Sequence, residues 1–161
     1  MQSSITDHPA RIVRAAQMPE DTPRFPAVIV GAGACGLTAA IRLREAGIEC
    51  LLLERDSLPS GSTALSSGFI PAAQTRLQRS LGIEDSHTQF AEDIMAKAHG
   101  QAASHLVKTY TEGVTQAIDA LEKHGIAFEI LDGFLYPGHR ARRMHAFADR
   151  TGVALMAALE R

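Results

Sequence analysis

The stretch "AVIVGAGACG", residues 27–36, decides the fold. Its first four residues, Ala27–Val30, are an apolar run typical of a buried parallel strand. A helix is predicted from about Gly36, because apolar side chains then recur at near-helical spacing, and Gly47 suits its C-terminal cap. Glu49–Leu53 form the second predicted strand. Strand, helix and strand in this order predict a βαβ unit with a right-handed crossover.

The glycines of this turn have the GxGxxG spacing that favours phosphate binding. Gly31 allows a tight turn, Gly33 keeps side chains away from a pyrophosphate, and Gly36 lets the helix pack close to the strand. The free N–H groups and the dipole at the helix start attract phosphates. Glu54, at the end of the second strand, can accept both ribose hydroxyls of an adenosine. These features predict a dinucleotide site, and the alternative is a glycine-rich turn without a ligand.

The residues that follow the second strand bear on which dinucleotide binds. A plain NAD domain continues with further βα units, whereas this chain enters a loop rich in Ser and Gly, "RDSLPSGSTALSSGF", residues 55–69. Hydroxyl and N–H groups are suitable partners for phosphate oxygens and for the polar edge of a ring cofactor. The loop is therefore a second candidate binding surface, with a plain surface loop as the alternative.

Composition narrows the class of protein. The chain has 161 residues, which suits one globular domain. Its net charge of -2 argues against nucleic acid or an anionic membrane as a partner. Two cysteines make no disulfide framework, and no His/Cys/Asp spacing predicts a metal site. No apolar run reaches the roughly 20 residues of a membrane span, and residues 1–26 lack the apolar centre of a secretory signal. We expect a flexible leader over residues 1–26 and a cytoplasmic protein.

The second half of the chain reads as mainly helical. A capping box of Ser86 and Gln89 begins one predicted helix, and a longer one spans Ser104–His124, with a stripe that includes Leu106. Ile126–Ile130 alternates like a half-exposed strand. The apolar stripe of the long helix consists of Leu106, Val107, Tyr110, Val114, Ala117, Ile118 and Leu121.

Turn residues predict how the chain returns after this strand. Asp132-Gly133 favours a hairpin in which Phe134–Tyr136 is the second strand. A basic loop, "GHRARRMHAF", residues 138–147, follows, and a last helix starts near Thr151. The predicted fold class is α/β, a βαβ unit followed by helices and a small β-hairpin.

Three blocks of the sequence resemble one family. They are "VIVGAGACGLTAAIRLREAGIECLLLER", "SGSTALSSGFIPA" and "GHRARRMHAFADRTGVALMAAL". In this order they resemble the N-terminal part of the fumarate reductase/succinate dehydrogenase flavoproteins, which include L-aspartate oxidase and ketosteroid dehydrogenases. The resemblance implies a Rossmann-like, glutathione-reductase-like FAD-binding domain. Residues 27–161 would be its N-terminal part, with the capping domain and C-terminal part absent.

The resemblance also implies a cofactor and the residues that hold it. FAD would contact Gly31, Ala32, Gly33, Cys35 and Gly36 with its pyrophosphate, Glu54 and Arg55 near the adenosine ribose, and Ser62, Thr63, Ser66, Ser67 and Gly68 along the diphosphate and the flavin ring. Ser62 stands where membrane-bound relatives attach FAD through a histidine, which implies non-covalent FAD. Cys35 is expected to be a small residue packed at the helix start, with a redox-sensitive thiol as the alternative.

By resemblance, the full enzyme would transfer a hydride between flavin N5 and a C–C bond of a small organic substrate. A fumarate- or succinate-like acid and a ketosteroid-like enone are both open, as is a non-catalytic dinucleotide-binding fragment or subunit. Catalytic residues would lie in the absent capping domain, and Arg143 and His145 of the basic loop are substrate-side candidates. The alternative for this loop is a solvated surface, or arginines that pair with acids of a missing domain. The chain alone is expected to be poorly stable and inactive, with open sheet edges and exposed apolar faces.

Overall fold

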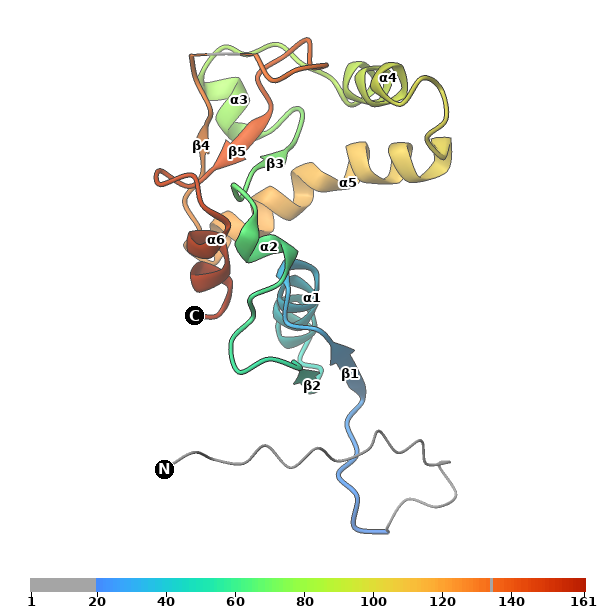
Figure 1. Cartoon of the computed structure of the whole chain (residues 1–161), viewed down its shortest axis with the longest axis vertical. Helices are drawn as coiled ribbons and strands as arrows, with labels where there is room; N and C mark the ends of the chain where they lie inside the picture. Colours follow the sequence, from blue (N-terminus) through green and yellow to red (C-terminus); the bar gives the residue numbers. More distant parts are fainter. Residues whose placement is uncertain (1–19, 134) are drawn as a thin grey trace.

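The computed structural model describes residues 20–133 and 135–161. Most of the expected leader and Phe134 of the expected hairpin therefore lie outside the described residues. Residues 20–26 run as a turn and irregular chain into the first strand. Figure 1 shows a βαβ unit near the N-terminus and a group of helices and short strands beyond it, with α2 and α6 between the two.

The first three elements are the predicted βαβ unit. β1 (Ala27–Val30) and β2 (Cys50–Leu53) are parallel neighbours, and α1 (Ala34–Glu45) connects them. The register pairs each residue of β1 with the residue of β2 that lies 23 positions further along the chain, as in Val30 with Leu53. The helix starts at Ala34 rather than near Gly36, because the glycine turn is tight enough to let the helix begin inside the GxGxxG stretch.

The second sheet differs from the predicted hairpin. Its order is β3 (Ile70–Pro71), β5 (Met144–Ala146) and β4 (Glu129–Ile130), and both pairings are antiparallel. The prediction of Phe134–Tyr136 as the partner strand is wrong for its described residues, since Leu135 and Tyr136 lie in no strand and β4 pairs with β5 from the predicted basic loop. All three residues of β5 are buried, as expected for the central strand of the sheet.

Side-chain bonds explain why the Asp-Gly pair does not close a tight hairpin. The carboxylate of Asp132 accepts hydrogen bonds from the N–H of Gly133, at 2.8 Å, and from the guanidinium of Arg142, at 2.6 Å. The N–H of Leu131 bonds the carbonyl of Met144 at 2.8 Å, which extends the pairing toward β5. The pair thus starts a longer connection that carries the arginines back to the sheet.

The remaining elements are helices. They are α2 (Ser62–Leu65), α3 (Arg76–Ser80), α4 (His87–Lys97), α5 (Ser104–Lys123) and α6 (Gly152–Leu159). α4, α5 and α6 confirm predicted helices, while α2 and α3 are too short for a periodic signal. Ser86 caps α4 by accepting the N–H of Gln89, but its own N–H bonds Asp85, so the reciprocal half of the predicted capping box is absent.

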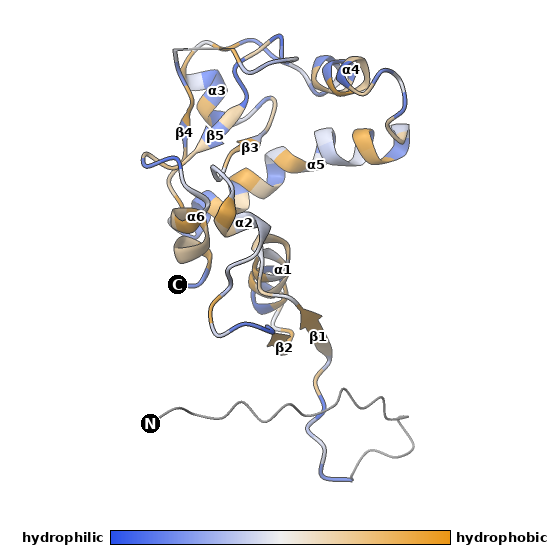
Figure 2. Cartoon of the chain, in the orientation of Figure 1, coloured by the Kyte–Doolittle hydropathy of each residue, from blue (hydrophilic) through white to orange (hydrophobic). Residues whose placement is uncertain are grey.

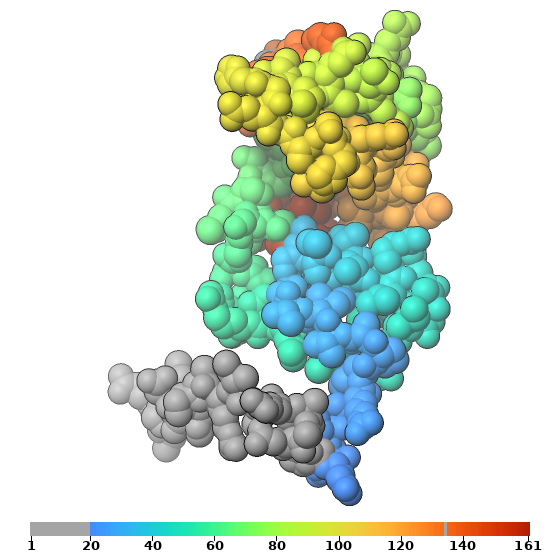
Figure 3. All heavy atoms as spheres, turned by 90° about the vertical axis from the view of Figure 1, so that its right-hand side faces the viewer, coloured from blue at the N-terminus to red at the C-terminus, as the bar shows by residue number. Residues whose placement is uncertain are grey.

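The core lies where α5, α6 and the antiparallel sheet meet. Val114, Ile118 and Leu121 of α5 pack with Leu155 and Leu159 of α6, and all five side chains are buried. The amphipathic pattern of α5 thus predicted much of its inward face, except that Leu106 and Tyr110, in the first half of the helix, are 62 % and 41 % exposed. Figure 3 shows the βαβ unit, in blue to cyan, beneath α4 and α5, in yellow to orange.

One face of the parallel sheet is open. Val28 and Val30 of β1 are 54 % and 84 % exposed, and Leu53 of β2 is 47 % exposed. Figure 2 shows apolar colour along β1 at the outer end of the molecule. Parallel sheets are normally covered on both faces, so this confirms the expectation of an exposed apolar face.

Candidate functional site

The glycine turn has the backbone geometry that its spacing predicts. Gly31 has a φ of 98°, in the region that favours glycine, and its N–H bonds the carbonyl of Leu53 at 2.7 Å. A Cβ on Gly36 would lie 1.9 Å from the carbonyl oxygen of Gly31, so only glycine fits there. A Cβ on Gly33 would meet no atom closer than 3.8 Å, which leaves open space above the turn.

The start of α1 favours an anionic ligand. The helix has no side-chain cap and no acidic residue in its first turn, and its N-cap is Gly33. The N–H of Ala34 bonds Thr63, and the helix dipole and the further N–H groups of such a first turn attract phosphate oxygens. The turn therefore fits the pyrophosphate of a dinucleotide.

Cys35 is exposed at this end of α1, so the expectation of a small residue packed at the helix start is wrong.

Glu54 turns toward the glycine turn from the end of β2. Its carboxylate accepts the N–H of Ala32 at 2.8 Å and the N–H of Asp56 at 3.1 Å. The bond from Ala32 is the main cause that lowers the pKa of Glu54 below its usual value, so the group is ionised at neutral pH. Arg55 beside it is exposed and pairs with Asp56. An exposed carboxylate next to the turn is suited to accept ribose hydroxyls.

The Ser-rich loop is brought to the same turn by α2. The hydroxyl oxygen of Thr63 accepts the N–H of Ala34, the first residue of α1, at 3.3 Å. The hydroxyl of Ser66 donates to the carbonyl of Thr63 at 2.7 Å and accepts the N–H of Gly68 at 3.0 Å. Ser62 and Ser67 are exposed, and Gly68 is buried with a φ of 66°. The second predicted block therefore contacts the first.

The substrate-side candidate Arg143 lies in a buried ion network. Its guanidinium donates two hydrogen bonds of 2.7 Å to Asp85 and one of 2.5 Å to Asp93, and it stacks 4.7 Å from the ring centre of Phe90. Arg140, whose side chain is exposed, also pairs with Asp93. The arginines thus pair with acids of this same chain, and sequence reasoning missed Asp85 and Asp93 because they lie 58 and 50 residues away.

His145 is equally enclosed. Its Nδ1 lies 2.8 Å from the carbonyl oxygen of Arg143, which can only accept, so Nδ1 carries the proton. Its Nε2 lies 2.9 Å from the hydroxyl of Thr75 and accepts that hydrogen bond. The side chain is fully buried. The substrate-side role of Arg143 and His145 stays a prediction, and these contacts favour a structural one.

Because of His145, we expect the free energy of unfolding to decrease as the pH is lowered. Burial is the main cause that lowers its pKa, against opposing contributions from backbone carbonyls and from Glu122 and Asp119. The unfolded chain therefore takes up a proton near pH 6.5 that the folded protein rejects until a lower pH. This stabilisation is fully present above about pH 6.5 and is lost as the pH falls toward the lowered pKa of His145. Urea unfolding between pH 7.5 and 5.5 should show this slope, and His145→Gln should flatten it.

A matched variant separates this effect from other histidines. His105 is exposed on α5, and His105→Gln should leave the slope unchanged. A His145→Gln protein with the wild-type slope would contradict the assignment.

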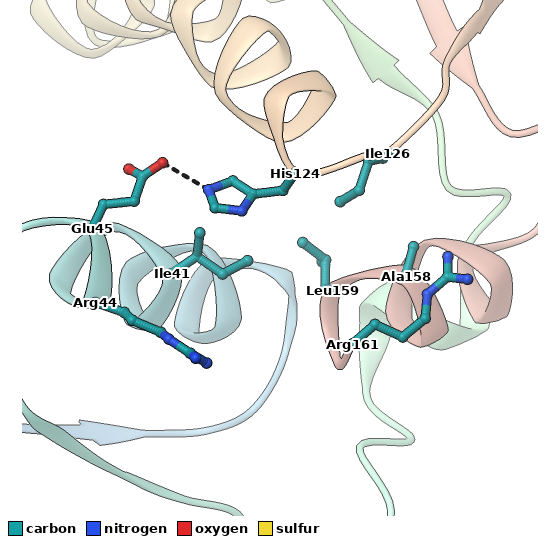
Figure 4. A pocket seen from close by; sticks show the side chains of 9 residues that line it. Ile41, Arg44, Glu45, His124, Ile126, Ala158, Leu159 and Arg161 are labelled. Atoms are coloured by element: carbon teal, nitrogen blue, oxygen red, sulfur yellow. Dashed lines mark hydrogen bonds and ion pairs between the residues drawn. The ribbon is translucent and has the colours of Figure 1, made fainter.

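A separate cavity of about 700 Å³ lies between the ends of α1 and α5 and the side of α6 (Figure 4). Ile41 and Leu159 contribute apolar surface, and His124 bonds Glu45 at 2.7 Å on its wall. None of the predicted cofactor residues lines it. The candidate site is thus the open surface at the glycine turn.

Within residues 20–133 and 135–161, no group of three or more His, Cys, Asp or Glu side chains could hold a metal ion. None of the helices there is long and apolar enough to cross a membrane.

The βαβ unit with its open glycine turn and facing acid is typical of dinucleotide-binding proteins. The model of the FAD binding domain family matches residues 27–161, and the chain belongs to this family. FAD is the cofactor that this membership assigns, and the geometry of the turn fits it.

Individual relatives agree with the family. The chain is 34 % identical over 102 residues to NADH:fumarate oxidoreductase of Klebsiella pneumoniae (strain 342), covering 63 % of this chain and 11 % of the relative. It is 34 % identical over 129 residues to urocanate reductase of Eggerthella lenta, covering 79 % and 21 %. The chain therefore spans about a fifth or less of these two relatives.

Solved structures show the same fold. The 3-ketosteroid-Δ4-(5α)-dehydrogenase of Rhodococcus jostii RHA1 superposes with a TM-score of 0.77 at 28 % identity, over 91 % of this chain and 37 % of that one. A flavocytochrome c3 fumarate reductase in its open conformation gives a TM-score of 0.75 at 26 % identity, over 84 % and 24 %.

Proposed function

We propose that the protein is an FAD-dependent oxidoreductase that transfers a hydride between flavin N5 and a C–C bond of a small organic substrate. Its relatives include a fumarate oxidoreductase and a ketosteroid dehydrogenase, which supports a fumarate- or succinate-like acid or a ketosteroid-like enone. FAD, when bound, supplies the redox chemistry, while the chain binds and orients it. We propose residues 27–161 as the N-terminal part of its Rossmann-like, glutathione-reductase-like domain, which begins with the βαβ unit.

One observation carries this proposal: two backbone N–H groups of the glycine turn bond side chains from the end of β2 and from α2 in the Ser-rich loop. Ala32 bonds Glu54, and Ala34 bonds Thr63. We assign the pyrophosphate to the turn and the adenosine ribose to Glu54. The diphosphate and the flavin ring are assigned to the loop from Ser62 to Gly68. The proposed cofactor residues are Gly31, Ala32, Gly33, Cys35, Gly36, Glu54, Arg55, Ser62, Thr63, Ser66, Ser67 and Gly68.

Replacing Glu54 tests this assignment. In Glu54→Gln the neutral amide is a weaker acceptor than the carboxylate for the ribose hydroxyls. We therefore expect the Kd for FAD to rise by roughly tenfold or more. Titration of the apoprotein followed by flavin fluorescence measures it.

Glu49→Gln is the matched control, because it removes the same charge from an exposed residue just before β2. It should bind FAD like the wild type. Equal affinity of Glu54→Gln and the wild type would place the adenosine end elsewhere.

We propose that the FAD is held without a covalent bond. Ser62, at the start of α2, offers a hydroxyl rather than the imidazole through which some relatives attach it. All flavin should therefore appear in the supernatant after acid precipitation of the loaded protein. Flavin that stays on the denatured chain would overturn this proposal.

A further inference from the structure

The first residues of α6 pack directly on the loop that we assign to the flavin. The N–H of Gly152 bonds the carbonyl of Ser66 at 2.8 Å. A Cβ on Gly152 would lie 1.8 Å from the carbonyl oxygen of Thr63 and 2.8 Å from that of Ser66. A Cβ on Gly68 would in turn lie 2.7 Å from the carbonyl oxygen of Thr151. Backbone therefore meets backbone at two points, and any side chain there would force the two segments apart.

The corner that carries Gly152 is itself fixed. Thr151 is the N-cap of α6, and its hydroxyl oxygen accepts the N–H of Ala154 at 3.2 Å. The same hydroxyl donates to Asp149 at 3.1 Å. Further along α6, Leu155 and Leu159 are buried in the core. The loop is thus held against an element that cannot move without disturbing the core.

The contact reaches the proposed site through one residue. Thr63, whose carbonyl faces Gly152, also accepts the N–H of Ala34 at the start of α1. Glu54 and the turn from Gly31 to Gly33 are instead held by β1 and β2. A shift at Gly152 therefore displaces the loop from Ser62 to Gly68. The flavin half of the site depends on this loop most, whereas the adenosine at Glu54 and the pyrophosphate at the glycine turn keep the contacts that β1 and β2 support.

We propose that Gly152 is a positioning residue for FAD, which holds the loop from Ser62 to Gly68 at the spacing that the flavin half needs. This inference rests on the proposed function. It assigns no contact between Gly152 and the cofactor. Thr151 supports the same spacing by fixing where α6 begins.

The test compares FAD with ADP, which carries only the adenosine and pyrophosphate part. In Gly152→Ala we expect the Kd for FAD to rise by roughly thirtyfold or more, about 2 kcal/mol at 1.4 kcal/mol per factor of ten, and the Kd for ADP to change by less than about threefold. Gly113→Ala is the matched control, because a Cβ on this helical glycine meets no atom within 4 Å. It should bind both ligands like the wild type.

A milder pair keeps the test decisive if Gly152→Ala does not fold. Thr151→Val removes the cap hydroxyl and keeps the shape, so FAD affinity should fall several-fold with ADP affinity unchanged, and Thr151→Ser should restore it. Parallel losses of FAD and ADP affinity in Thr151→Val, or unchanged FAD affinity in a folded Gly152→Ala, would overturn the inference. A wild-type protein that binds ADP but no FAD would overturn the proposed function first, and this inference with it.

Discussion

Gly36→Ala is expected to abolish FAD binding and to destabilise the βαβ unit. The added Cβ would lie 1.9 Å from the carbonyl oxygen of Gly31 and 3.2 Å from the Ile29 side chain, so the helix must move away from β1. Overpacking of this kind costs about 1–3 kcal/mol and more where backbone is the obstacle. In a helix Ala is more favourable than Gly by about 1 kcal/mol, so helix propensity alone predicts a gain in stability. A loss of stability would therefore be due to the clash and not to helix propensity.

Two other glycines give the controls. Gly33→Ala places its Cβ 3.8 Å from the nearest atom, so the fold should persist while the methyl group obstructs the pyrophosphate and weakens FAD binding. Gly113→Ala should be neutral or slightly stabilising. Urea unfolding of the apoprotein and FAD titration measure the two effects separately. A Gly36→Ala protein with wild-type stability would contradict the close helix–strand contact.

Arg143→Met is expected to cost about 3–5 kcal/mol, because it leaves the buried carboxylate of Asp85 without its cation and that of Asp93 with Arg140 alone. The side chain of Asp85 is 0 % exposed and that of Asp93 is 6 % exposed. A loss of this size is a large part of the total stability of a typical domain, about 5–15 kcal/mol. Urea unfolding at pH 7 measures it, or, if the variant does not fold, its yield and circular dichroism.

Arg142→Met is the matched control. Its partner Asp132 is 80 % exposed, and ion pairs in contact with water contribute little to stability. A cost of Arg143→Met no larger than that of Arg142→Met would contradict the buried network.

The pH dependence gives a second readout of the same network. Burial acts to raise the pKa of Asp93, but the hydrogen bonds from Arg143 and Arg140 outweigh it and hold this pKa below its usual value. The stabilisation from Asp93 is therefore present above about pH 4 and lost as the pH falls through the lowered pKa. In Arg143→Met the carboxyl can protonate at higher pH, so the stability gap between the two proteins should narrow between pH 7 and 4.

Patterns in neighbouring residues predicted much of the fold. The βαβ unit, α5 and the start of α6 at Thr151 follow from apolar periodicity and capping residues, which act within one or two turns. The errors arose where the partner was distant. Asp132-Gly133 carries a turn signal, yet the strand that pairs with β4 begins at Met144, because Asp132 and Leu131 bond residues at the far end of the connection.

The candidate site divides in the same way. The spacing of Gly31, Gly33 and Gly36 and the place of Glu54 identified its two main parts, because backbone conformation near a strand end is a local property. Cys35 was expected to pack at the helix start but is exposed, since α2 contacts this end of α1 at Ala34 and leaves Cys35 uncovered. Local spacing does not reveal which neighbours cover a residue.

The sequence by itself determined that this protein begins its binding domain with a strand, a glycine turn and a helix suited to a dinucleotide phosphate. Only the tertiary structure decided that Arg143 is neutralised by Asp85 and Asp93, and that Gly152 meets the carbonyl of Thr63. The physical reason is the separation along the sequence between the residues that interact. Short segments take their backbone conformation from nearby sterics and hydrogen bonds, whereas residues 50 or more positions apart meet only where the packing of the core brings their elements together.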